Sequence, residues 1–141
     1  MSLKFSESEL QQHLDASLFH KQFALRVMSV AGDAQVLTLR MPFSAALERT
    51  PGSGQYHGGA IASFIDIAAD FALVALIAVP VPTINFRVDY LRPAMGTFLV
   101  AHARVRRIGK AIAVVDVDVQ DAEHRFVAVG RGCYGTQASA M

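Results

Sequence analysis

Four residues that could take part in chemistry recur at helical spacing within one apolar stretch of the chain. They are separated by four, three and four positions, and they are Gly59, Ser63, Asp66 and Asp70. This spacing places them on one stripe of an α-helix. Carboxylates can act as general bases or nucleophiles, and hydroxyl or backbone N–H groups can stabilise the charge that develops. The pattern predicts that any catalytic or binding role of this stretch lies on that stripe.

The stretch itself has the features of a buried helix over about 58–79. Ala, Leu and Ile dominate it, and no helix breaker occurs before Pro80. A helix that is hydrophobic on all sides is buried inside a protein. A membrane span is disfavoured because Asp66 and Asp70 would each cost about 2.5–3.5 kcal/mol to insert. We therefore expect the core helix of a protein that has no membrane partner.

The glycines that open this helix add hydrogen-bond donors to the stripe. Gly58 and Gly59 fall in the first turn, where backbone N–H groups have no partner within the helix and lie at the positive end of its dipole. Asp66 would be poorly solvated in this apolar segment. Hydrogen bonds from Ser63, from Thr83 or from free helix N–H groups must therefore stabilise its ionised form.

The donor and the carboxylate lie too far apart to serve one small group within a single chain. Eight residues of helix from Gly58 to Asp66 span about 12 Å along the axis. The two groups that meet at one site are therefore expected to come from different chains. This predicts a homodimer in which two central helices lie side by side and antiparallel, with two composite sites.

The composition indicates one globular domain over residues 1–141. Its apolar content of 52% is high and its charged content of 18% is low, so much surface must be buried, part of it against a second copy. The formal net charge of +1 gives no indication of a nucleic-acid partner. One cysteine, Cys133, excludes an internal disulfide. With no signal-like apolar core near the N-terminus, these features predict a cytoplasmic protein.

The flanking segments are predicted to form a second helix and six strands. A capping box of Ser6 and Glu9 predicts an N-terminal helix over about 6–20. Alternating apolar and polar residues predict a hairpin of strands at 23–30 and 35–43, a loop over 44–57, and a four-strand meander over about 83–136, with strands at 83–92, 97–107, 111–121 and 125–136. Short connections require antiparallel neighbours. One long helix on one curved antiparallel sheet gives an α+β fold.

This order of elements resembles the hotdog fold, and two motifs narrow the resemblance. The first is His57-Gly58-Gly59 followed by Asp66, and the second is the run Asp89-Tyr90-Leu91-Arg92-Pro93-Ala94. Together they resemble the phenylacetate-degradation (PaaI-type) branch of the hotdog acyl-CoA thioesterases. The likeness extends from about residue 18 to residue 136.

The resemblance implies roles for residues at matching positions. Asp66 matches the nucleophile or general base that acts on the thioester, and the backbone N–H of Gly58 matches the donor that polarises its carbonyl. His57 matches the histidine that shapes the loop, and Thr83 matches a hydroxyl that positions water or the acid. The substrate would be an acyl-CoA, whose contacts would include Gly59, Gln55, Ser63, Asp70, Arg107 and Lys110. The resemblance also implies a homodimer, and pairs of dimers are common in the family.

One position departs from the family pattern. Relatives carry Asn or Gln six residues before the histidine, where this chain has Pro51. Either Gln55 replaces that amide from a differently folded loop, or the carbonyl has one donor fewer. Arg107 and Lys110 lie in a basic strand connection; they form either an ordinary charged turn or a contact for the CoA phosphates.

Two alternative functions use the same scaffold. An enoyl-thioester hydratase would need a histidine paired with the aspartate, but no histidine follows Asp66 until His102. A non-catalytic acyl-CoA binding protein would be consistent with Pro51. No Cys/His cluster or phosphate-binding loop occurs, so we predict neither a metal nor a cofactor; coenzyme A is part of the substrate.

Overall fold

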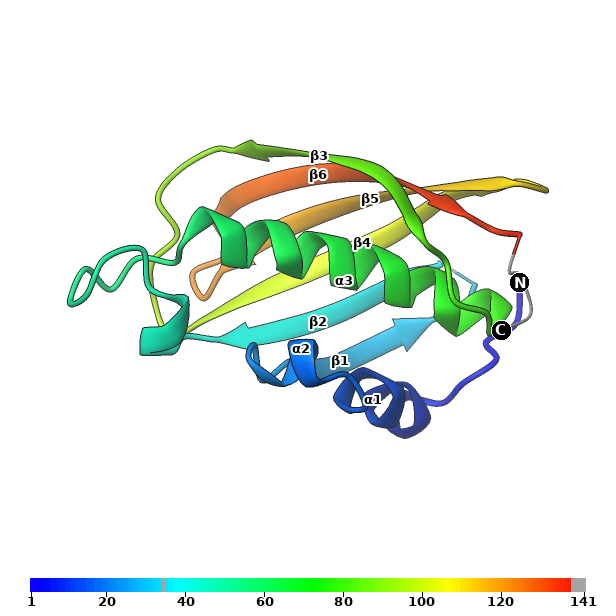
Figure 1. Ribbon diagram of the computed structural model, residues 1–141, viewed down its shortest axis with the longest axis horizontal. Helices are drawn as coiled ribbons and strands as arrows, with labels where there is room; N and C mark the ends of the chain where they lie inside the picture. The colour runs from blue at the N-terminus through cyan, green and yellow to red at the C-terminus, as the bar shows by residue number, and fades with distance from the viewer. Residues whose placement is uncertain (34, 138–141) are drawn as a thin grey trace.

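A six-stranded antiparallel sheet curls around one long helix (Figure 1). The computed structural model describes residues 1–33 and 35–137. The helices are α1 (Glu7–Asp15), α2 (Leu18–Lys21), α3 (Gly58–Ile77) and a 3₁₀ turn, η1 (Ala45–Leu47). The strands are β1 (Arg26–Ala31), β2 (Val36–Pro42), β3 (Thr83–Tyr90), β4 (Phe98–Ile108), β5 (Ile112–Asp121) and β6 (Phe126–Gly135). The predicted α+β hotdog architecture is confirmed.

The central helix α3 begins at Gly58 as expected and ends two residues before the predicted boundary. Ala78 adopts the left-handed conformation, with φ 54°, while its N–H still bonds to the carbonyl of Val74. This local geometry closes the last turn, and Pro80 prevents any continuation. The helix is long and apolar enough to cross a membrane, but 67% of that apolar window is buried in this fold. It is the core helix that the composition predicted.

The sheet order differs in one respect from the predicted meander. The strands lie in the order β1-β2-β4-β5-β6-β3, so β3 pairs with β6 and not with β4. The connection from Leu91 to Thr97 passes the N-terminal end of α3, where Leu91 donates to Val127 and Ala94 accepts from Tyr56. These contacts carry the chain across the mouth of the curved sheet. A short connection therefore does not imply adjacent strands when the sheet curls around a helix.

The single N-terminal helix predicted over 6–20 is two helices. The capping box is present: Ser6 accepts from the N–H of Glu9, and the Glu9 side chain accepts from the N–H of Ser6. The first helix ends at Asp15, and Ser17 starts the second by accepting from the N–H of His20. A second capping serine within the leucine pattern ended the helix early. Both helices lie along the β1 side of the sheet (Figure 1).

Close contact between α3 and the sheet depends on a glycine in β6. Gly130 faces the helix, and a Cβ atom there would lie 2.8 Å from Ile65 Cγ2 and 2.9 Å from the carbonyl oxygen of Arg87. Both distances are shorter than a normal carbon contact. Any side chain at this position would therefore push α3 or β3 away from the sheet.

We expect Gly130→Ala to destabilise the protein by about 1–3 kcal/mol, the usual cost of overpacking a core. The matched control is Gly135→Ala on the same strand, where the nearest atom to an added Cβ is Pro82 Cγ at 3.4 Å, an ordinary contact. Urea denaturation followed by circular dichroism measures both. Equal unfolding midpoints for the two variants would contradict this account of the helix–sheet contact.

Candidate active site

The carboxylate of Asp66 is held in the middle of α3 by two hydroxyl groups. Its Oδ1 atom accepts from Thr83 Oγ1 at 2.9 Å and from the Tyr134 hydroxyl at 3.0 Å. Thr83 lies at the start of β3, and Tyr134 lies near the end of β6. Asp66 is half-buried. Its side chain therefore contacts strands β3 and β6 and is still partly accessible to solvent.

The predicted partners of Asp66 are thus partly as expected. Thr83 makes the predicted contact, whereas Ser63 makes no side-chain hydrogen bond within the described ranges 1–33 and 35–137. Sequence reasoning missed Tyr134. A signal was available, because Tyr134 is the one aromatic residue in a segment, 130–135, that contains three glycines. A buried tyrosine usually has a hydrogen-bond partner for its hydroxyl.

The N-terminus of α3 presents one free N–H group, not two. His57 is the N-cap, and its Nδ1 atom accepts from the N–H of Gly59 at 2.8 Å. The expectation that Gly59 offers a free donor is therefore wrong, because the preceding histidine caps it. The N–H of Gly58 has no acceptor among the residues that the structure describes. Its carbonyl oxygen accepts from the Tyr90 hydroxyl at 2.6 Å.

These contacts give His57 an ordering role. An Nδ1 atom that accepts a hydrogen bond carries no proton, so the ring is fixed as a cap on the helix. The His57 N–H also donates to the Leu47 carbonyl at 2.7 Å. The residue thus holds the loop and the first turn of α3 together, which is the loop-shaping role that the resemblance implied.

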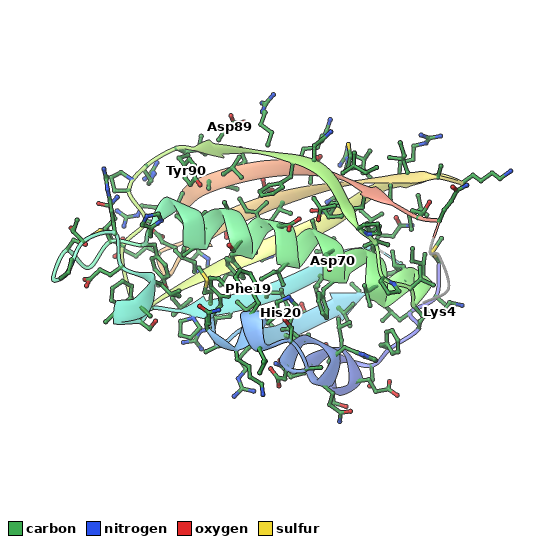
Figure 2. All side chains as sticks on the ribbon, viewed as in Figure 1. Lys4, Phe19, His20, Asp70, Asp89 and Tyr90 are labelled. Carbon is green, nitrogen blue, oxygen red and sulfur yellow. The ribbon has the colours of Figure 1, made fainter. Side chains whose placement is uncertain are left out.

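A cleft of about 540 Å³ opens at this end of the helix. Its lining residues include Arg49, Gln55, His57, Gly58, Gly59, Tyr90 and Arg92. Figure 2 shows Tyr90 at the end of β3, above the first turns of α3. The cleft therefore combines a free backbone donor, an amide side chain and two guanidinium groups, a combination suited to a carbonyl group attached to an anionic carrier.

The loop before the cleft explains the departure at Pro51. The Glu48 carboxylate accepts from the N–H of Gly52 at 2.9 Å and from that of Gly54 at 2.7 Å. This folds the segment into a tight turn with Pro51 exposed, away from the cleft lining. Gln55 follows the turn and lines the cleft. Of the two alternatives for this loop, the geometry favours the one in which Gln55 is the available amide.

Two predicted phosphate-binding residues lie elsewhere within the chain. Arg107 is the second-last residue of strand β4, and Lys110 is in the connection to β5. Figure 1 shows that the β4–β5 connection lies at the opposite end of the fold from the start of α3. One chain therefore does not bring them to the cleft. Arg49 and Arg92 are the basic residues that line it.

Asp70, which the sequence analysis named as a substrate contact, lies one helical turn beyond Asp66 on α3. Its Oδ1 atom is buried and has no hydrogen-bond partner in the part of the chain that the structure describes. Burial, and next the nearby carboxylate of Asp66, raise the pKa of Asp70 from its ordinary value of 3.8 to about 7. Figure 2 shows its place on α3. The stripe thus holds two carboxylates in unlike surroundings.

The comparisons with known proteins agree with this fold. Residues 54–128, more than half of the chain, match the thioesterase superfamily. A Halobacterium salinarum protein described as an esterase is 39% identical over 109 residues, which cover 70% of this chain and 72% of that protein. The medium/long-chain acyl-CoA thioesterase YigI of Escherichia coli is 31% identical over 93 residues, 55% of this chain and 60% of YigI.

Among solved structures, the chain is similar to PaaI from the phenylacetic acid degradation operon of Escherichia coli. The TM-score is 0.76 with 22% identity, over 96% of this chain and 99% of PaaI. At this identity the likeness concerns the fold. This chain belongs to the thioesterase superfamily.

We expect Asp70→Asn to stabilise the protein increasingly as the pH rises from 4 to 7. In that window the unfolded chain releases the Asp70 proton while the folded protein keeps it, so the contribution of Asp70 to stability falls with rising pH and levels off above about 7. The advantage of the variant should grow by about 2–4 kcal/mol across the window.

Urea denaturation at several pH values measures this advantage. Asp118→Asn, at an exposed carboxylate on the outer face of the sheet, controls for the loss of a charge. A stability difference between Asp70→Asn and wild type that stays constant from pH 4 to pH 7 would show that Asp70 ionises as easily in the folded as in the unfolded chain.

Proposed function

We propose that this protein hydrolyses acyl-CoA thioesters to the free acid and CoA. The observation that carries the proposal is the state of the Asp66 carboxylate: two hydroxyl groups bind Oδ1, while no hydrogen bond to Oδ2 occurs among the described residues. A carboxylate that is fixed by one oxygen and free at the other is suited to act as a base or a nucleophile. The acyl-CoA activity of YigI supports the choice of carrier.

The proposed reaction uses a donor and a carboxylate. The thioester oxygen accepts from the Gly58 N–H, at the positive end of the α3 dipole. Asp66 Oδ2 either removes a proton from water as the water attacks the carbonyl carbon, or attacks that carbon itself to form an anhydride that water then cleaves. In both routes the C–S bond breaks and CoA leaves as its thiolate. A single oxyanion donor of this kind contributes about 3–4 kcal/mol to transition-state stabilisation.

The proposed site requires a second copy of the chain. Gly58 and Asp66 are separated by about 12 Å along α3, so one carbonyl cannot reach both in one chain. Strand β3 forms an open edge of the sheet, and three of its helix-side residues are strongly exposed: Ile84 at 55%, Phe86 at 37% and Tyr90 at 52%. We propose that β3 and the partly exposed stripe of α3 that carries Ser63, Asp66 and Asp70 pack against the same surfaces of a second copy, in a homodimer.

Charge complementarity to CoA follows from the same arrangement. In an antiparallel pair, the end of one chain that carries Arg107 and Lys110 approaches the end of the other that carries the cleft. These two residues could then supplement Arg49 and Arg92 around an anionic carrier. On the basis of the family resemblance, we also propose that two such dimers associate into a tetramer.

We expect Asp66→Asn to lower kcat for acyl-CoA hydrolysis at least 100-fold with little change in KM, because it removes the base or nucleophile and keeps the side-chain shape. Release of free thiol from acyl-CoAs of varied chain length, with aromatic acyl-CoAs included, measures the rate. Tight binding without thiol release in the wild type would identify a binding protein, and loss of an enoyl chromophore without thiol release would identify a hydratase.

The composite site is tested by combining two inactive variants. Gly58→Pro removes the N–H donor at the first helical position, where proline is well tolerated, and the extended conformation of His57, with φ −65° and ψ 137°, suits a following proline. Gly58→Ala is the matched control, because it adds a Cβ atom at the same place, 3.3 Å from the Tyr90 hydroxyl, and keeps the donor.

Mixing Gly58→Pro with Asp66→Asn chains, after unfolding and refolding together, should restore about a quarter of the wild-type activity. Half of the dimers would then be mixed, and each mixed dimer would hold one intact site. Each variant refolded alone should stay inactive. Absence of recovery in a mixture that is shown to contain mixed dimers would place donor and carboxylate in the same chain and reject the shared site.

A further inference from the structure

We propose that Tyr134 is a positioning residue for Asp66: with Thr83 it fixes Oδ1 and so selects Oδ2 as the oxygen that acts on the substrate. The catalytic part of this inference rests on the proposed thioesterase function. The contact itself is the 3.0 Å hydrogen bond from the Tyr134 hydroxyl to Asp66 Oδ1. Tyr134 does not need to touch the substrate in this role.

The sheet register brings the two hydroxyl groups together. Thr83 and Tyr134 are direct partners across the β3–β6 pair, so both side chains leave the sheet at the same level and on the same face. That face lies against α3 at Asp66, and both hydroxyls reach the same oxygen. Two donors from two strands define the position of a carboxylate much more narrowly than one donor on a flexible loop would.

The fold makes specific room for the Tyr134 ring. The side chain is fully buried, with 0% of its surface exposed, and it lies across Gly132, two residues earlier on the same face of β6. A Cβ atom on Gly132 would be 2.5 Å from the ring atom Cε2 and 2.5 Å from the hydroxyl oxygen. Glycine at this position is therefore what lets the ring lie along the strand and direct its hydroxyl at the helix.

The charges around Asp66 keep the Tyr134 hydroxyl protonated, so that it can donate to the carboxylate. The titratable groups that face it are Tyr134 from β6 and Asp70 from its own helix, while β3 contributes Thr83, which does not titrate. Burial, and next the charge of Asp66, raise the pKa of Tyr134 well above its ordinary value of 10.0. The phenol therefore remains a donor, which favours the ionised form of its carboxylate partner.

Tyr134→Phe tests the inference because it removes only the hydroxyl. We expect kcat to fall about 10- to 100-fold, the usual effect of losing a hydrogen bond to a charged group, with KM within about twofold. The acid limb of the pH profile of kcat/KM should move to higher pH, because the carboxylate loses a donor. Thr83→Val, at an exposed edge position, removes the other donor and should shift the limb the same way.

Tyr56→Phe is the matched control for lost stability. Tyr56 borders the cleft, but its side chain is also buried, at 1% exposure, and its hydroxyl donates to the Met41 carbonyl and not to Asp66. The acid limb of this variant should stay in its wild-type position. A Tyr134→Phe protein that is folded and whose acid limb coincides with that of the wild type would overturn the inference and leave Tyr134 as a packing residue.

A second readout separates this inference from the proposed function. In protein labelled with ¹³C at aspartate carboxyl carbons, Asp66→Asn identifies the Asp66 resonance, and its titration is followed without any substrate. We expect it to titrate at higher pH in Tyr134→Phe than in the wild type or in Tyr56→Phe. If the wild type hydrolyses no acyl-CoA, the proposed function fails, while this titration still decides the contact: identical curves reject the inference, and a shifted curve supports it.

Discussion

The structure depends on how closely one apolar helix can approach one sheet. Alanines on α3 and Gly130 on β6 remove the side-chain volume that would otherwise hold the two layers apart. Close packing of this kind gives the apolar side chains the many small dispersion contacts that a looser interface would lose. It also brings the middle of α3 within hydrogen-bond reach of the sheet. The polar groups at Asp66 can therefore meet only because the apolar contact around them is tight.

The start and the middle of α3 carry different parts of the site. At its start, capping by His57 leaves a single free donor at Gly58, beside a cleft that includes Gln55. At its middle, Asp66 lies between two hydroxyl groups. A rigid helix of twenty residues keeps these parts at a fixed separation. In the proposed dimer this separation is bridged, because an antiparallel neighbour brings the start of one helix to the middle of the other.

Sequence reasoning found most of the helices and strands, because helix periodicity, capping residues and short motifs are local. The central helix, its polar stripe with Asp66, and Thr83 as a donor to that carboxylate follow from such signals, whereas the loop-shaping role of His57 was implied by the family resemblance. Long-range features were less accessible. The pairing of β3 with β6 depends on how the sheet curls, and the contact of Tyr134 with Asp66 joins residues 68 positions apart. The loss of the Gly59 donor depends on a side-chain orientation that residue types do not specify.

The open edge of β3 has a consequence for how this protein behaves when it is damaged or diluted. A strand with an unpaired edge and exposed apolar side chains is a template onto which other chains can add. Pairing between two copies would cover this edge, so the free energy of unfolding would depend on protein concentration. A substitution that prevents such pairing is therefore expected to yield aggregated protein in place of a well-behaved single chain, and genetic variation along β3 should be restricted for that reason even at positions far from the carboxylate.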